Sequence, residues 1–111
     1  IMALNPFGEK VNKSTIIVEG TFQEDSEEFF PEYSKRVRDY LVKHDGEVIR
    51  RQGIERTLYG DSTPDLIMVI DFPSKEVAES IFFEQEYLDI IPLRDKIFKK
   101  FKMYLAPYGE I

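Results

Sequence analysis

The side chains best suited to chemistry in this sequence are two carboxylates and an arginine on extended segments. Glu19 lies in an apolar run at residues 15–22, Asp71 lies in another at residues 66–72, and Arg51 lies in a third segment. Inside an apolar cavity, burial raises the pKa of one carboxyl group while an arginine stabilises the charge of another. Such a cluster could support general acid/base catalysis, so Glu19 and Asp71 are the candidate catalytic residues.

The same three residues also admit a structural interpretation. Because buried charges must generally be paired, Glu19, Asp71 and Arg51 could form an ion-pair network that holds two sheets in register. We favour this role, since perturbed carboxyl groups also occur in purely structural networks. A register error of one residue would move the whole set to the other face of the sheet.

Three residues are candidates for binding a ligand: Arg51, Arg94 and Tyr104. Arg94 lies where a predicted helix ends, so its guanidinium could neutralise helix carbonyls or clamp a carboxylate ligand, and both roles stay open. Tyr104 lies on the last predicted strand, on the face that we assign to a cavity. A pocket lined by these residues together with the two carboxylates is the expectation.

Several kinds of site are excluded by what the chain lacks. It has no cysteine and one histidine, His44. Thiolate nucleophiles and cysteine-based metal centres are therefore excluded, and one histidine is too few for a His-rich metal site or a Ser-His-Asp triad. His44 falls at a predicted helix C-terminus, where a cation is favoured. The sequence also has no glycine-rich phosphate loop. We therefore predict no metal and no cofactor.

The segments that must position these residues alternate between strand and helix patterns. β-Branched and aromatic residues with a period of two indicate strands, and a wholly apolar run indicates a strand buried on both faces. The second strand is expected to bend at Gly53. The predicted strands are residues 15–22, 47–59, 66–72 and 98–106.

The first helix is predicted to begin at a cap near Ser26 and to run to about His44. Pro31 should bend it near its start, and Asp45-Gly46 should close it in a left-handed turn. These boundaries place an apolar stripe of the helix towards the core.

A second helix is predicted to begin after Ser74 and, after a break, to end at Pro92. Residues 1–13 show no period and are predicted to be an irregular N-terminal extension, with residues 14–109 forming one domain. The resulting order, βαββαβ, indicates an α+β ferredoxin-like fold. Its antiparallel sheet has the order 4-1-3-2, with two helices on one face.

Four places along the chain resemble the uncharacterised family called domain of unknown function 1330. The last two below are the most specific, and the resemblance covers roughly residues 14–109. It implies a ferredoxin-like protein whose four-stranded sheets meet face to face as a dimeric α+β barrel, with no established biochemical role. The four places are Phe30 with Tyr33, residues 45–51 (DGEVIRR), residues 71–74 (DFPS), and Glu86-Tyr87 followed by Pro92-Leu93-Arg94.

The strand sequences themselves also favour a dimer. Helices cover only one face of such a sheet, yet Ile17, Ile67 and Val69 give the other face an apolar character. An uncovered apolar surface of this kind usually marks an interface, because burying it contributes about 25 cal/mol per Å². We therefore predict a homodimer.

Net charge and hydropathy argue against two further classes of partner, nucleic acids and membranes. A net charge of -6 repels nucleic acid and anionic lipid, and no apolar run approaches the length of a membrane span. We expect no nucleic-acid or membrane partner and a cytoplasmic location. The favoured hypothesis is a barrel that binds a small polar or anionic molecule, with cofactor-free isomerase or oxygenase chemistry suggested by analogy of fold. The alternative is a non-enzymatic binding or regulatory dimer, so whether the protein is an enzyme stays open.

Overall fold

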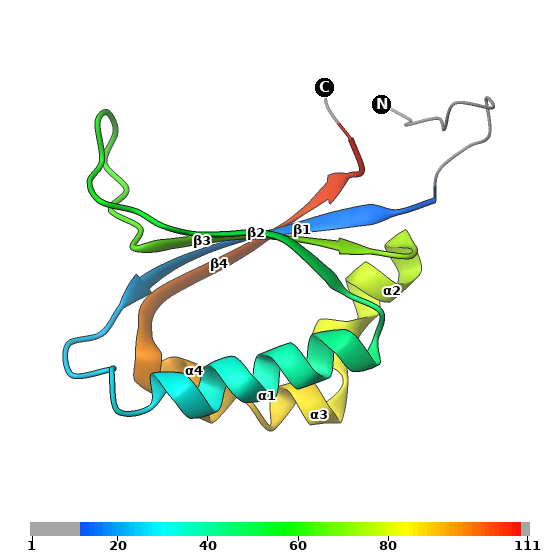
Figure 1. The fold of residues 1–111 in the computed structure, drawn as a ribbon, viewed down its shortest axis with the longest axis horizontal. Coiled ribbons are helices and arrows are strands. Elements are labelled where there is room, and N and C mark those ends of the chain that lie inside the picture. Colours follow the sequence, from blue (N-terminus) through cyan, green and yellow to red (C-terminus); the bar gives the residue numbers. More distant parts are fainter. Residues whose placement is uncertain (1–11, 110–111) are drawn as a thin grey trace.

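The computed structural model describes residues 12–109 and contains one antiparallel sheet with its helices on one face (Figure 1). The spatial order β2-β3-β1-β4 is the predicted order seen from the other edge, and the fold is the predicted α+β ferredoxin-like type. Only Asn12 and Lys13 of the predicted N-terminal extension fall within the described residues. The strands are β1 (Ser14–Phe22), β2 (Glu47–Gly53), β3 (Leu66–Phe72) and β4 (Phe98–Pro107).

The two central strands lie almost where the sequence pattern places them. β3 has the predicted bounds, and β1 begins one residue earlier than predicted. In register, Val18 lies opposite Met68 of β3 and Met103 of β4, and all three belong to the core or pack against it on the side of the helices. We call this side of the sheet the helix face and the other side the open face.

The first helix, α1 (Phe30–Lys43), begins later than predicted. Pro31 lies in its first turn, where the missing N–H has no helical partner to lose, so it starts the helix and does not bend it. At the other end the left-handed residue is Asp45, with a φ of 59°. The Gly46 N–H then donates to the Leu41 carbonyl at 2.7 Å and closes the helix.

The second helix was predicted with one break, and it is divided further than that. Four short elements occupy this part of the chain: α2 (Lys75–Ser80), the 3-10 turn η1 (Ile81–Phe83), α3 (Gln85–Leu88) and α4 (Ile91–Ile97). Ser74 caps α2 by accepting a hydrogen bond from the Val77 N–H at 3.1 Å. Pro92 lies in the first turn of α4, so it begins a helix where we expected it to end one.

The edge strand β2 is shorter than predicted and carries an unpredicted bulge. It ends at Gly53, and its irregularity lies between Val48 and Arg50, not at Gly53. Ile49 has no partner in the register, because Val48 pairs with Ile70 and Arg50 already pairs with Val69. β2 therefore has one more residue than the part of β3 with which it pairs. Every side chain after the bulge therefore points to the face opposite to that of a regular strand.

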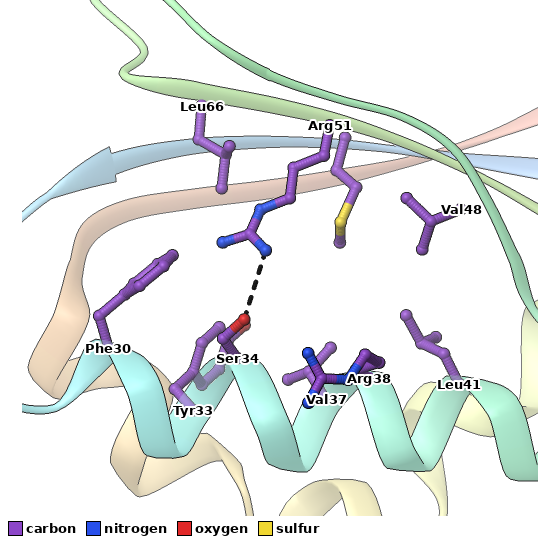
Figure 2. A pocket seen from close by; sticks show the side chains of 10 residues that line it. Phe30, Tyr33, Ser34, Val37, Arg38, Leu41, Val48, Arg51 and Leu66 are labelled. Carbon is purple, nitrogen blue, oxygen red and sulfur yellow. Dashed lines mark hydrogen bonds between the residues drawn. The ribbon is translucent and has the colours of Figure 1, made fainter.

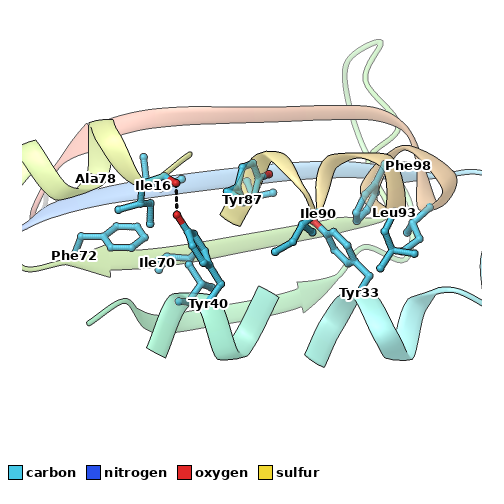
Figure 3. Close-up of a cluster of buried hydrophobic side chains, with 14 residues drawn as sticks. Ile16, Tyr33, Tyr40, Ile70, Phe72, Ala78, Tyr87, Ile90, Leu93 and Phe98 are labelled. Carbon is cyan, nitrogen blue, oxygen red and sulfur yellow. Dashed lines mark hydrogen bonds between the residues drawn. The ribbon is translucent and has the colours of Figure 1, made fainter. Parts of the chain in front are cut away.

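The hydrophobic core fills the layer between the helix face and the helices (Figure 3). Ile70, Phe72, Ile81 and Ile97 are its most deeply buried large side chains. The buried Tyr40 hydroxyl donates to the Ile81 carbonyl, which ties α1 to η1. No helix within residues 12–109 has the length and apolar character that a membrane span needs.

Candidate functional site

The two candidate catalytic carboxylates both lie on the open face, as predicted, but they do not form one site. Asp71 lies opposite Thr15 of β1, whereas Glu19 of β1 lies opposite Ile67. Glu19 lies four residues beyond Thr15, so at about 3.3 Å per residue the two carboxylate residues are roughly 13 Å apart along the strands. Their carboxyl groups are too far apart to share a proton or a small substrate.

Asp71 is already engaged by a neighbouring strand. The Thr15 hydroxyl donates to Asp71 Oδ1 at 2.6 Å, and both residues are buried. On the other side of Asp71, the register places Glu47 of β2. A carboxylate that accepts a short hydrogen bond within the sheet acts as a cross-strand tie.

Glu19 and Tyr104 occupy other parts of the open face. Glu19 lies opposite Lys102 of β4, in a polar hollow of about 250 Å³ whose other side is formed by residues 61–64. Tyr104 lies opposite Ile17 and is 46% exposed. Residues 12–109 contain no group of three His, Asp or Glu side chains placed to hold a metal ion.

Arg51 does not join the carboxylates, and the prediction that it faces them is wrong. It lies opposite Met68, on the helix face, while its neighbour Arg50 lies opposite Val69 on the open face. The bulge at Ile49 is the physical reason, because it advances β2 by one residue and exchanges the faces of the two arginines.

Arg94 also lies away from the carboxylates, among the helices. Its Nη1 donates to the Tyr87 hydroxyl at 3.2 Å, and its guanidinium carbon lies 4.8 Å from the centre of the Phe101 ring. Burial raises the pKa of the Tyr87 hydroxyl, which Arg94 opposes by its hydrogen bond and its charge. These contacts pack α4 against β4. They differ from both roles considered for Arg94, so its binding of a ligand stays a prediction.

A separate hollow of about 200 Å³ lies between α1 and the β2–β3 edge of the sheet, and we call it the α1–β2 cleft (Figure 2). Arg51 enters it from β2, and its Nη1 donates to the Ser34 hydroxyl of α1 at 3.3 Å. The Arg51 guanidinium also lies 5.2 Å from the centre of the Phe30 ring. The cleft is lined by Phe30, Tyr33, Ser34, Val37, Arg38, Leu41, Val48, Arg51, Leu66 and Met68.

The charge in the α1–β2 cleft has one sign. Arg38 and Arg51 line it, and no Asp or Glu does. None of the ion pairs formed within residues 12–109 uses either arginine. Burial raises the pKa of Tyr33 well above its usual value, so its hydroxyl remains protonated at neutral pH. The cleft therefore has mostly apolar walls, with two guanidinium groups and the Ser34 hydroxyl in its lining.

Sequence reasoning did not single out Ser34 and Arg38 as site residues, although a signal for them existed. They follow Phe30 at spacings of four residues, so the three lie along one face of α1. In the fold, β2 lies beside that face of α1, so these residues lie close to Arg51. The bulge that turns Arg51 towards it has no comparable sequence signal.

The sheet order and the helix placement define an α+β protein of the ferredoxin-like class. Within that class, the model of the family described as domain of unknown function (DUF1330) matches residues 14–106. The chain belongs to this family, as the motifs in its sequence indicated. No curated protein matches the chain.

Solved structures with the same architecture come from several bacteria. The protein of unknown function RPA0582 from Rhodopseudomonas palustris is 13% identical over 91% of this chain and 85% of that chain, with a TM-score of 0.74. SnoaB, a cofactor-independent oxygenase from Streptomyces nogalater, is 10% identical over 90% and 96%, with a TM-score of 0.64. A dimeric protein of unknown function from Bacteroides fragilis is 7% identical over 87% and 97%, with a TM-score of 0.60. At these identities the likeness establishes the fold alone.

Proposed function

We propose that this protein is a homodimer in which each protomer binds a small amphipathic anion in the α1–β2 cleft, without a cofactor and without turnover. The observation that carries the proposal is the cleft's combination of apolar walls with Arg51 and Arg38 and no lining carboxylate. A carboxylate is the ligand group that best matches a guanidinium, because it accepts two parallel hydrogen bonds.

The ligand site proposed here differs from the site that the sequence alone suggested. The sequence-based hypothesis placed a polar or anionic molecule in a cavity between the sheets, with Glu19, Asp71, Tyr104 and the two arginines around it. The helix-face position of Arg51 favours the cleft within each protomer. A carboxylate at Arg51 would replace the Ser34 oxygen as acceptor of the Arg51 hydrogen bond and would accept a hydrogen bond from the Ser34 hydroxyl. Its apolar body would contact Val37, Val48 and Met68.

Binding is favoured over catalysis because the candidate acid/base residues lie across the sheet from the cleft. Glu19 and Asp71 are on the open face, and the lining of the cleft includes no carboxylate and no imidazole. Isomerase or cofactor-free oxygenase chemistry, the other possibility raised by the fold, would need a base within hydrogen-bond reach of the ligand. The Tyr33 hydroxyl is protonated at neutral pH, as in any tyrosine, and burial raises its pKa further, so it does not supply a base.

The open face supports the dimeric part of the proposal. Ile17, Ile67 and Val69 form a half-buried apolar stripe across the two central strands, and the helices cover only the opposite face. A second copy laid against this stripe would remove it from water. The two α1–β2 clefts would then lie on the outer sides of the paired sheets.

The direct test is calorimetric titration of octanoate into the wild-type protein and into Arg51→Met. A charged hydrogen bond contributes about 1.5–3 kcal/mol, and the exposure of Arg51 places its effect at the low end. We therefore expect wild-type binding and roughly a tenfold weaker affinity in Arg51→Met. Octanol, which has the same chain and no charge, should bind no better to the wild type than to the variant.

Arg50→Met is the matched control, because Arg50 is the adjacent residue on the same strand with its side chain on the open face. It should bind octanoate like the wild type. Equal losses in both variants would refute the assignment of the anion site to the cleft. Mass spectrometry of the ligand after incubation should return unchanged octanoate, and a new product would refute binding without turnover.

A further inference from the structure

The polar hollow at Glu19 is a second candidate site, separate from the α1–β2 cleft. Its volume is about 250 Å³, and residues 61–64 of the loop that joins β2 to β3 form one side of it. In Figure 1 this loop extends past the end of the sheet. The other side is the open face, where Glu19 lies opposite Lys102 and Thr21 lies opposite Lys100. We call this site the loop hollow.

Three hydrogen bonds fasten the loop to β1 and hold the shape of the loop hollow. The Thr21 hydroxyl donates to the Thr63 carbonyl at 3.2 Å. The Phe22 N–H donates to Asp65 Oδ2 at 2.9 Å. The Asp65 N–H donates to the Gly20 carbonyl at 2.8 Å. A ligand would therefore meet a wall that is already ordered, which reduces the entropy cost of binding.

The loop hollow has acidic and basic side chains in equal number, and they are not paired with each other. Glu19 and Asp61 are the acidic residues of its lining, and Lys100 and Lys102 are the basic ones. Opposite charges that face each other across two strands usually attract. Yet none of the ion pairs formed within residues 12–109 uses any of these four residues. A ligand with a single charge would be attracted by two of them and repelled by the other two, whereas a zwitterion can satisfy both signs.

The loop hollow also restricts the size and the polarity of a ligand. Its volume is below the about 300–1,000 Å³ of typical small-molecule sites, and Pro64 is the only apolar residue among the described residues that line it. We propose that the loop hollow binds a small polar α-amino acid, with the carboxylate at Lys100 and Lys102 and the ammonium group at Glu19 and Asp61. This inference does not rest on the anion site in the α1–β2 cleft, because the two sites lie on opposite faces of the sheet.

The test is a titration of the ¹⁵N-labelled protein with L-serine, followed by the NMR shifts of its backbone amides. Two comparison ligands each lack one charge of L-serine: 3-hydroxypropionate has no ammonium group and ethanolamine has no carboxylate. L-Serine should shift the amides of Thr21, Ser62 and Lys102 and should bind more tightly than either comparison ligand. Lys102→Met and Glu19→Gln should each weaken L-serine binding about two- to fivefold, as expected for charged contacts near the surface.

Lys99→Met and Glu55→Gln are the matched controls, because both residues are exposed and neither lines the loop hollow. They make the same changes of net charge and should bind L-serine like the wild type. The amide spectrum of each variant shows whether it is folded, and the comparison of the three ligands in the wild type depends on no variant.

Three outcomes would overturn the proposal. The first is that L-serine causes no saturable shifts at the loop hollow. The second is that 3-hydroxypropionate or ethanolamine binds the wild type as tightly as L-serine, because the loop hollow would then recognise one charge and not a zwitterion. The third is that the control variants lose as much affinity as Lys102→Met and Glu19→Gln, because the effect would then come from net charge and not from this site.

Discussion

Arg50 and Arg51 are adjacent in the chain and lie on opposite faces of the sheet. One unpaired residue, Ile49, decides which of them meets Ser34 of α1 and which faces away. The two arginines have the same intrinsic chemistry, so their different roles come entirely from strand register. This pair therefore offers a comparison in which charge, size and sequence neighbourhood are nearly constant.

Because of its buried tyrosines, the free energy of unfolding of this protein should depend on pH in the alkaline range. Burial raises the pKa of Tyr33 above its model-compound value of 10.0, so above pH 10 the unfolded chain loses a proton that the folded chain keeps. The stabilisation is complete below pH 10 and is lost as pH rises towards the folded pKa. We expect the free energy of unfolding, measured with urea, to fall above pH 10 more steeply in the wild type than in Tyr33→Phe. The slopes should differ by up to about 1.4 kcal/mol per pH unit.

Tyr59→Phe is the control for this experiment, because Tyr59 is 98% exposed and its surroundings change little on unfolding. Lysine titration is common to all three proteins and cancels from the comparison. A Tyr33→Phe slope equal to that of the wild type would show that Tyr33 ionises in the folded state, contrary to its buried position.

At the scale of elements, the predictions succeeded where one signal was strong and uninterrupted. β3 is a continuous apolar run and β1 alternates, so their bounds and faces followed from the sequence. Proline gave an ambiguous signal, because the same residue can end one helix or begin the next. Pro31 and Pro92 both lie in first turns. Only the packing of the surrounding chain distinguishes these uses.

The candidate site was less predictable than the fold, for a reason specific to strands. Glu19, Asp71 and Tyr104 lie on the face predicted for them, because their strands are regular at those positions. Arg51 does not, because a bulge inserts one residue without a distinctive composition. The cleft itself depends on the distance between α1 and β2, which no local pattern encodes.

The turn that joins α1 to β2 should tolerate no side chain at Gly46. A Cβ at this position would lie 2.9 Å from Phe72 Cε1 and 3.1 Å from the Leu41 carbonyl oxygen, and both residues are buried. We expect Gly46→Ala to lower the free energy of unfolding by about 1–3 kcal/mol, measured with urea.

Gly53→Ala provides the comparison at the other end of β2. A Cβ there would meet nothing within 4 Å, so the free energy of unfolding should change by less than about 0.5 kcal/mol. A loss of stability in Gly53→Ala as large as that in Gly46→Ala would contradict the steric explanation.

In the molecule as a whole, the two faces of the sheet have different roles. The helix face carries the core and the α1–β2 cleft, and the open face carries the apolar stripe proposed to meet a second copy. Ligand binding and association are then separable, because a substitution on one face has no contact with the other.

The proposed dimer can be tested at the centre of that stripe. Val69→Lys places a charge on the open face of a central strand, where pairing would bury it at a cost of several kcal/mol. We expect sedimentation velocity to show a dimeric wild type and a monomeric, folded Val69→Lys. Val42→Lys, on the 68% exposed outer side of α1, should remain dimeric. A monomeric wild type at micromolar concentration would contradict the dimer.

The proposed anion site lies between α1 and β2, on the helix face. The most direct measurement is the change of backbone amide NMR shifts when octanoate is added to the ¹⁵N-labelled wild type. We expect the largest changes at Ser34, Arg51 and Leu66, which line the cleft. Largest changes at Glu19, Asp71 and Tyr104, on the open face, would contradict it.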